Sequence, residues 1–151
     1  MKIYEQQETG WCGPASLQIA LAHLGEEYEQ DWIAHTTACS VFGETSNDAM
    51  LRFVSLNGFS FWCLVLARWE DLLFGDGVVT IVDYTKDGVG HYSVVVDRKQ
   101  EYLYLADPEV GNIEVWERKL FEEHWHDDGC SRWALIIYKK GSETWDLSLI
   151  L

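Results

Sequence analysis

The sequence lacks the patterns that mark several protein classes. It has four cysteines in 151 residues and no C-x-x-C pair, which does not fit a disulfide framework or a structural zinc site. No apolar run approaches the length of a membrane span, and the first residues, "MKIYEQQETGW", contain no hydrophobic segment of a signal peptide. We therefore expect a soluble, cytoplasmic protein with reduced thiols.

Basic residues are scarce. The chain has 11 Lys and Arg residues against 25 Asp and Glu residues, which gives a formal net charge of −14. Nucleic-acid binding depends on Lys and Arg contacts to phosphates, so we expect no nucleic-acid partner. A basic peptide partner fits this charge, although acidity alone often serves only solubility.

Apolar residues are present in the ordinary globular share. They make up 48% of the chain, with eight tryptophans, so intrinsic disorder is not expected. We find no linker, internal repeat or low-complexity segment. The length suits one domain spanning residues 1–151, in which residues 140–151 form either a last strand or a loose tail.

The hydrophobic pattern places helices before strands. We expect helices at 15–25, 27–39 and 47–58, the last capped by Thr45 or Ser46, and helical turns at 67–77 and 119–125. We expect strands at 59–66, 78–84, 91–96, 101–106, 113–117 and 131–140. Helices followed by strands that tight turns connect predict an α+β fold with an antiparallel sheet, not a doubly wound one.

Cys12 has the setting of a nucleophile. In "EQQETGWCGPAS" it precedes Gly-Pro and a long apolar run, so it lies at a helix N-terminus, where the helix dipole favours negative charge. A thiol there loses its proton more easily. Most free cysteines are inert small hydrophobes, and this is our interpretation of Cys39, Cys63 and Cys130.

A catalytic thiol needs a histidine partner. Among the five histidines, His91 follows the glycine-flanked loop "DGVG" and begins a strongly β-prone strand, which would hold its side chain rigidly. His23 and His35 fall in predicted helices and are more simply packed or exposed. His124 and His126 form an H-x-H that could bind a metal weakly, but an exposed acidic helix is the simpler explanation.

Further residues could complete such a site. A hairpin would return Asp107, in "LADPEVG", to the side of His91, where it could orient the imidazole. Taken alone, Asp107-Pro108 is simply a turn. The Cys12 N–H could stabilise an oxyanion, together with the side-chain amide of Gln6 or Gln7 just upstream.

The motifs "Q-x5-C-G-P-A-S-L", "GHYSVVV" and "ADPEVG" together resemble the papain-like cysteine peptidases. The chain is most similar to the bacteriocin-processing branch, which cleaves leader peptides after a double glycine. The resemblance implies a papain-like fold, with an N-terminal helical half that carries the nucleophile helix and a C-terminal antiparallel sheet half. It also implies catalytic residues Cys12, His91 and Asp107, with Gln6 as the oxyanion residue, and neither cofactor nor metal.

The expected function is therefore hydrolysis of a peptide or amide bond. Gly13, Gly88 and Gly90 would leave a narrow entrance that favours small residues before the scissile bond, unless these glycines serve only turns. One alternative is a catalytically silent module that binds peptides or acts as an immunity-type protein. Another is thiol-dependent acyl transfer or deamidation, which shares the chemistry and differs in the acceptor.

Overall fold

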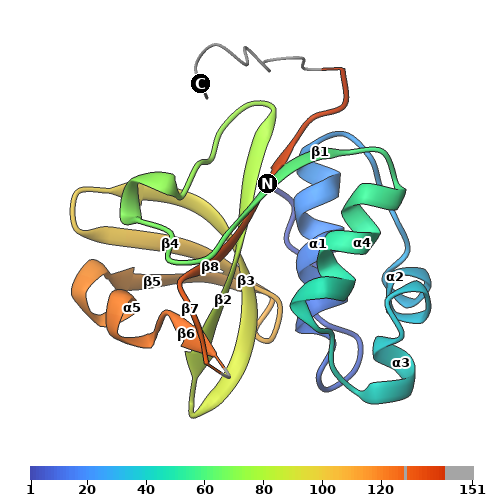
Figure 1. Ribbon diagram of the computed structural model, residues 1–151, viewed down its shortest axis with the longest axis horizontal. Coiled ribbons are helices and arrows are strands. Elements are labelled where there is room, and N and C mark those ends of the chain that lie inside the picture. The colour runs from blue at the N-terminus through green and yellow to red at the C-terminus, as the bar shows by residue number, and fades with distance from the viewer. Residues whose placement is uncertain (128, 142–151) are drawn as a thin grey trace.

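The computed structural model describes residues 1–127 and 129–141. A group of helices packs against one face of an antiparallel sheet, and a shorter helix covers the other face (Figure 1). This arrangement confirms the predicted α+β class. Most of the predicted tail, at residues 142–151, lies outside the described residues. No helix within those residues is long and apolar enough to cross a membrane.

The helical half contains the predicted nucleophile helix. Its helices are α1 (Cys12–His23), α2 (Gln30–Thr36), α3 (Cys39–Phe42) and α4 (Asn47–Leu56). Ser46 is the N-cap of α4, because its hydroxyl oxygen accepts a hydrogen bond from the Ala49 N–H at 3.1 Å. The short helix α3 occupies a segment that we expected to end a longer helix and begin a loop. Ala38, with a φ of 62°, separates it from α2.

The sheet half follows in chain order. Its strands are β1 (Ser60–Leu64), β2 (Val78–Lys86), β3 (Val89–Lys99), β4 (Tyr102–Asp107), β5 (Asn112–Glu117) and β8 (Trp133–Tyr138), in the spatial order β1-β8-β2-β3-β4-β5. The 3₁₀ helix η1 (Trp69–Asp71), helix α5 (Arg118–His124) and the small pair β6 (His126–Asp127) and β7 (Cys130–Ser131) complete the described elements.

Two hairpins bring the later motifs together. Asp87 and Gly88, with φ values of 52° and 77°, form the turn between β2 and β3, the pattern of a type I′ hairpin. Strand β3 then continues through Asp97–Lys99, where we had expected a turn, and a bulge after Val95 keeps it paired with β4. The hairpin of β3 and β4 still brings Asp107, at the end of β4, beside His91, near the start of β3.

The sheet buries apolar side chains on both faces. Ile81, Val94 and Leu135 pack against α1 and α4 in one cluster. The neighbouring Val82 and Val95 point the other way, toward α5 and η1, in a second cluster, as the two-residue period of a strand requires. The first cluster packs α1, and with it the N-terminus of this helix, against the sheet.

Candidate active site

Cys12 is the first residue of α1 and is partly buried. The first N–H groups of a helix have no partner inside the helix, so they point to this end unsatisfied. Close packing fixes the turn: a Cβ on Gly13 would lie 2.8 Å from the Cβ and the hydroxyl oxygen of Thr45. The first turn of α1 therefore accepts only glycine after Cys12.

His91 and Asp107 meet across the β3–β4 hairpin. His91 is 6% exposed and Asp107 is 0% exposed, and His91 Nε2 lies 2.7 Å from Asp107 Oδ1. The same oxygen accepts a hydrogen bond from the Glu109 N–H at 2.9 Å. Because Nε2 is bound to the Asp107 carboxylate, Nδ1, which lies 3.8 Å from Glu109 Oε2, is the nitrogen available to the Cys12 thiol.

The environment of His91 favours the imidazolium. Burial lowers its pKa, but hydrogen bonds to Asp107 and Cys12 and the negative charges of both groups outweigh burial and raise the pKa to about 9. Burial raises the pKa of Asp107, whereas the bond and charge of His91, together with Lys86, bring it below its ordinary value. Near neutral pH the pair is an imidazolium beside a carboxylate.

The His91 ring is also held by packing. Tyr84 lies opposite His91 in the β2–β3 pairing, and the two rings meet edge to face with centroids 5.6 Å apart. The Tyr84 hydroxyl lies 2.9 Å from the Ser93 hydroxyl, and burial raises the pKa of Tyr84, so this phenol stays neutral. Tyr84 therefore acts as a fixed, uncharged wall beside the imidazole.

The segment before Cys12 is fastened to the Asp107 turn. The Gln6 N–H donates to the Pro108 carbonyl at 2.8 Å. The side-chain oxygen of Gln6 is buried and has no hydrogen-bond partner among the described residues. A buried acceptor of this kind costs free energy unless a donor from water or a ligand meets it; an oxyanion would instead accept from the side-chain NH2 of Gln6.

Gln30, which our sequence analysis missed, holds the same segment to α1. Its side-chain oxygen accepts from the Gln7 N–H at 2.7 Å, and its nitrogen donates to the Glu5 carbonyl at 3.1 Å and to Gln18 Oε1 at 2.8 Å. Gln30 thus sets the position of Gln6 relative to Cys12. A lone glutamine early in a helix carries no local signal of this role.

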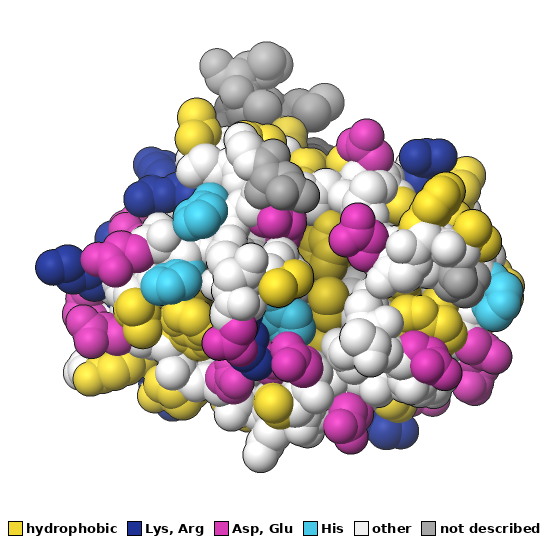
Figure 2. Space-filling model, turned by 90° about the horizontal axis from the view of Figure 1, so that it is seen from below, with side chains coloured by type: hydrophobic (Ala, Val, Ile, Leu, Met, Phe, Trp, Pro, Cys, Tyr) yellow, Lys and Arg dark blue, Asp and Glu magenta, His cyan; other side chains and the backbone are white. Residues whose placement is uncertain are grey.

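A groove of about 1060 Å³ lies between the helical half and the sheet. Figure 2 shows a hollow with a hydrophobic floor and acidic side chains along its sides. Trp32 and Phe53 line it on the helical side, and Tyr92 on the sheet side. Thr45, which packs against Gly13 in α1, is part of its lining, whereas Cys12, His91 and Asp107 are not among its lining residues.

The remaining cysteines differ from Cys12. All four cysteines are free, and burial raises the pKa of Cys39, Cys63 and Cys130, so these three stay protonated near neutral pH. They lie at the start of α3, in β1 and in β7.

The other histidines do not join His91 and Cys12. Ring nitrogens of His23, His35 and His124 lie within 2.9 Å of backbone carbonyl oxygens, and His126 is exposed in β6.

One group of possible metal ligands contains His91, Asp107 and Glu109, whose ligand atoms lie within 4.8 Å of one another. The Lys86 ammonium already provides a cation here, 2.6 Å from Asp107 and 3.7 Å from Glu109. Lys86 is a second residue that our sequence analysis missed, because it lies just beyond the predicted strand at 78–84. We attribute this group to the His91 site and not to a metal centre.

Each glycine near the site is explained by its own local structure. Gly88 forms the hairpin turn with open space around it, whereas a Cβ on Gly90 would lie 2.2 Å from the Asp127 carboxylate. Gly13 is required by Thr45. Two of these glycines therefore allow close packing beside the catalytic segments, and one serves a turn.

A helical half that presents a cysteine at a helix N-terminus to a His–Asp pair on an antiparallel sheet defines the papain-like cysteine peptidase fold. The model of the Peptidase C39 family matches residues 1–131. The chain therefore belongs to the Peptidase C39 family, and it is a cysteine peptidase.

Solved structures show the same fold. The peptidase domain of Streptococcus ComA, a bifunctional ABC transporter, is 19% identical with a TM-score of 0.75, over 92% of this chain and 98% of that chain. A double-glycine motif protease from an AMS/PCAT transporter, in complex with its leader peptide, is 18% identical with a TM-score of 0.71, over 90% of each chain. A C39-like peptidase from Bacillus anthracis is 14% identical with a TM-score of 0.71, over 91% of this chain and 94% of that chain. No curated protein matches the chain significantly.

Proposed function

We propose that the protein hydrolyses a peptide bond through Cys12, His91 and Asp107, with Gln6 and the Cys12 N–H stabilising the oxyanion. The observation that carries this proposal is the buried His91–Asp107 hydrogen bond of 2.7 Å beside a thiol at a helix N-terminus. Residues 1–151 would act as one cytoplasmic domain, which the free state of all four cysteines supports.

The reaction would proceed in two stages. His91 already holds, at Nδ1, the proton taken from the Cys12 thiol, so the thiolate sulfur bonds to the carbonyl carbon while the carbonyl electron pair moves to oxygen. The oxyanion collapses, the C–N bond breaks, and His91 gives its proton to the leaving amine. Water then donates a proton to His91 as its oxygen attacks the thioester, and the C–S bond breaks to release the acid and the thiolate. Asp107 holds His91 in position throughout.

We propose a peptide as the substrate, bound in the groove beside α1. One structural neighbour is a double-glycine motif protease bound to a leader peptide, which supports small residues, glycine or alanine, before the scissile bond. Thr45 closes the space next to Gly13, in agreement with a narrow site at this point. Glu44, Asp83 and Asp127 are acidic members of the groove lining, and they support Lys or Arg elsewhere in the substrate.

A peptide library with mass-spectrometric mapping of the products tests this function. We expect new termini after Gly or Ala, no cleavage by a Cys12→Ala variant, and a kcat/KM that falls as salt rises, because screening weakens attraction to basic peptides. Equal cleavage after Leu, Phe and Gly would contradict the narrow site. A salt-independent kcat/KM would contradict the electrostatic part.

The same experiment separates the alternatives. Deamidation would add about one mass unit to an intact peptide, and acyl transfer would yield a conjugate with an added amine. A silent binding module would change no peptide at all, although it has no need of the complete set of Gln6, Cys12, His91 and Asp107.

Gln6→Ala should lower kcat by about 100-fold, the scale seen when one oxyanion donor is lost. Gln7→Ala is the matched control, because the Gln7 side chain is exposed and its backbone N–H donates to Gln30. Steady-state kinetics of the two variants measure the difference. A larger loss for Gln7→Ala than for Gln6→Ala would show that we assigned the wrong glutamine to the oxyanion.

The pH dependence should report the raised pKa of His91. The imidazolium is needed to protonate the leaving amine, so kcat/KM should hold its plateau below the His91 pKa of about 9 and fall as pH rises through it. A pH profile in buffers of constant ionic strength measures this limb. A fall centred near the ordinary histidine value, about 6.5, would contradict a His91 held by Asp107 and Cys12.

A further inference from the structure

Lys86, the last residue of β2, is unusually buried for a lysine. Its side chain is only 14% exposed, and lysine is rarely buried to this degree unless it is paired. The two-residue period of β2 puts it on the same face as Tyr84, which lies opposite His91 in the next strand. Lys86 therefore reaches the His91 site from the side remote from the thiol.

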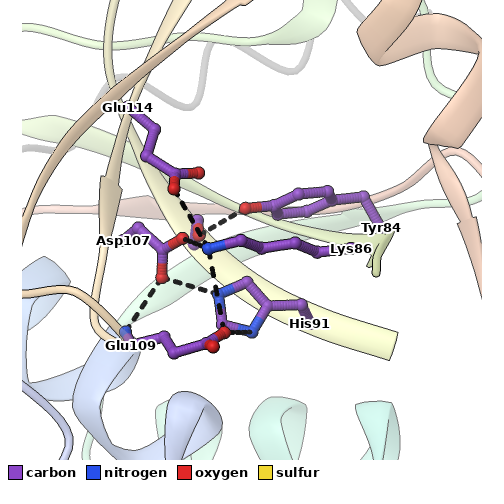
Figure 3. Close-up of polar contacts among 7 residues, drawn as sticks. Tyr84, Lys86, His91, Asp107, Glu109 and Glu114 are labelled. Carbon is purple, nitrogen blue, oxygen red and sulfur yellow. Dashed lines mark hydrogen bonds and ion pairs between the residues drawn. The ribbon is translucent and has the colours of Figure 1, made fainter. Parts of the chain in front are cut away.

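The charges on this face alternate. Lys86 Nζ lies 2.6 Å from Asp107 Oδ2 and 3.0 Å from Glu114 Oε1, while the other oxygen of Asp107 binds His91. Figure 3 shows Asp107 at one side of the two cations, with one carboxylate oxygen bonded to the ammonium and the other to the imidazole. Glu109 also approaches both cations, 3.7 Å from Lys86 Nζ and 3.8 Å from His91 Nδ1. The order is Glu114, Lys86, Asp107, His91, with a negative and a positive group in turn.

We propose that Lys86 is a positioning residue of the active site. It holds the Asp107 carboxylate ionised and correctly oriented, and it offsets part of the negative charge that this carboxylate presents to His91. Glu114 anchors Lys86 from the edge strand β5. This inference rests on the proposed function for its meaning in catalysis.

Physical reasons support this role. A carboxylate with no exposed surface is costly unless charged or polar partners surround it. Lys86 binds Oδ2, and His91 and the Glu109 N–H bind Oδ1, so the plane of the Asp107 carboxylate cannot rotate without breaking one of these bonds. The Lys86 ammonium and the His91 ring bind the two oxygens of the same carboxylate. The positive charge of Lys86 therefore opposes protonation of the imidazole, because like charges repel in a partly buried site.

Several other ionisable groups surround Lys86 and His91. Burial lowers the pKa of Lys86, but the bonds and charges of Asp107 and Glu114 outweigh it and raise the pKa, so the lysine stays charged. Tyr84 packs on His91, and Cys12, Asp107, Glu109 and Glu114 contact the two cations or act on them electrostatically. Asp87 and His124 line the same surface pocket as Lys86.

Lys86→Met tests the proposal by two measurements. In kcat/KM profiles the alkaline limb should move up by about one pH unit, because a nearby positive charge is lost, and kcat at pH 7 should fall about 10- to 100-fold through misplacement of His91. NMR titration of His91 in a Cys12→Ala background should show the same upward shift without any need for activity. Lys99→Met, an exposed lysine on β3, is the matched control for the change in net charge.

The variants separate positioning from a merely structural role. Lys86→Arg keeps the charge and should leave the alkaline limb near the wild-type pH. If Lys86→Met does not fold, the double variant Lys86→Met, Glu114→Met removes both partners of the pair and should still show an upward, smaller shift. An unmoved His91 titration in Lys86→Met or in the folded double variant would overturn the inference. Inactive wild-type protein with a shifted His91 titration would instead refute only the proposed function.

Discussion

Cys12→Ala should abolish hydrolysis and leave the fold intact. Removal of a nucleophile from a cooperating set costs about 10⁵-fold or more in kcat, because the remaining groups cannot form the thioester. Cys12 is partly exposed at the start of α1, so loss of its sulfur should cost no more than about 1 kcal/mol of stability. The test is turnover of a cleavable library peptide, with thermal unfolding measured on the same sample.

The matched control for this variant is Cys63→Ala, which removes another partly buried thiol, in β1 and outside the groove lining. It should retain wild-type turnover. Hydrolysis by Cys12→Ala at a rate similar to that of Cys63→Ala would end the proposal of a Cys12 thioester.

His91→Ala should be nearly as damaging, with a loss of about 10⁴-fold or more in kcat. The variant loses both the base that accepts the thiol proton and the acid that protonates the leaving amine. Asp107 would keep Lys86 and the Glu109 N–H as partners, so its buried charge stays compensated and the fold should survive. Single-turnover kinetics and circular dichroism measure the two effects.

His35→Ala is the control for this change, since His35 is exposed on α2 and its ring contacts the Asp31 backbone carbonyl. Its turnover should equal that of the wild type. A folded His91→Ala protein with more than a tenth of wild-type activity would contradict the role of His91.

Much of the fold could be predicted because each local signal agreed with its neighbours. Pro14 after Cys12 marked the start of α1, and the β-prone runs with turns between them marked the hairpins. The Asp87-Gly88 pair even fixes the register of β2 against β3. The short helix α3 and the β6–β7 pair were missed because a few residues carry too little periodicity to indicate an element.

Some residues of the candidate site could likewise be predicted from the sequence, and others could not. Cys12, His91 and Asp107 each stand in a recognisable local motif, so the sequence was sufficient to nominate them, and the structure brings His91 and Asp107 together. Lys86 and Gln30 act through partners that are distant in sequence, and no local pattern separates them from ordinary surface residues. Lys86 could have been found by applying the β2–β3 register, because it falls two residues after the partner of His91.

Alkylation of the native protein is the most direct test of the central claim, that Cys12 is the activated nucleophile. Iodoacetamide at limiting concentration and neutral pH, followed by mass-spectrometric location of the label, compares all four thiols in one sample. We expect Cys12 to be labelled first and to lose this advantage in His91→Ala. Burial raises the pKa of Cys39, Cys63 and Cys130, so the alkylation of these three thiols should be slow. Preferential labelling of any of these three in the folded protein would contradict the account.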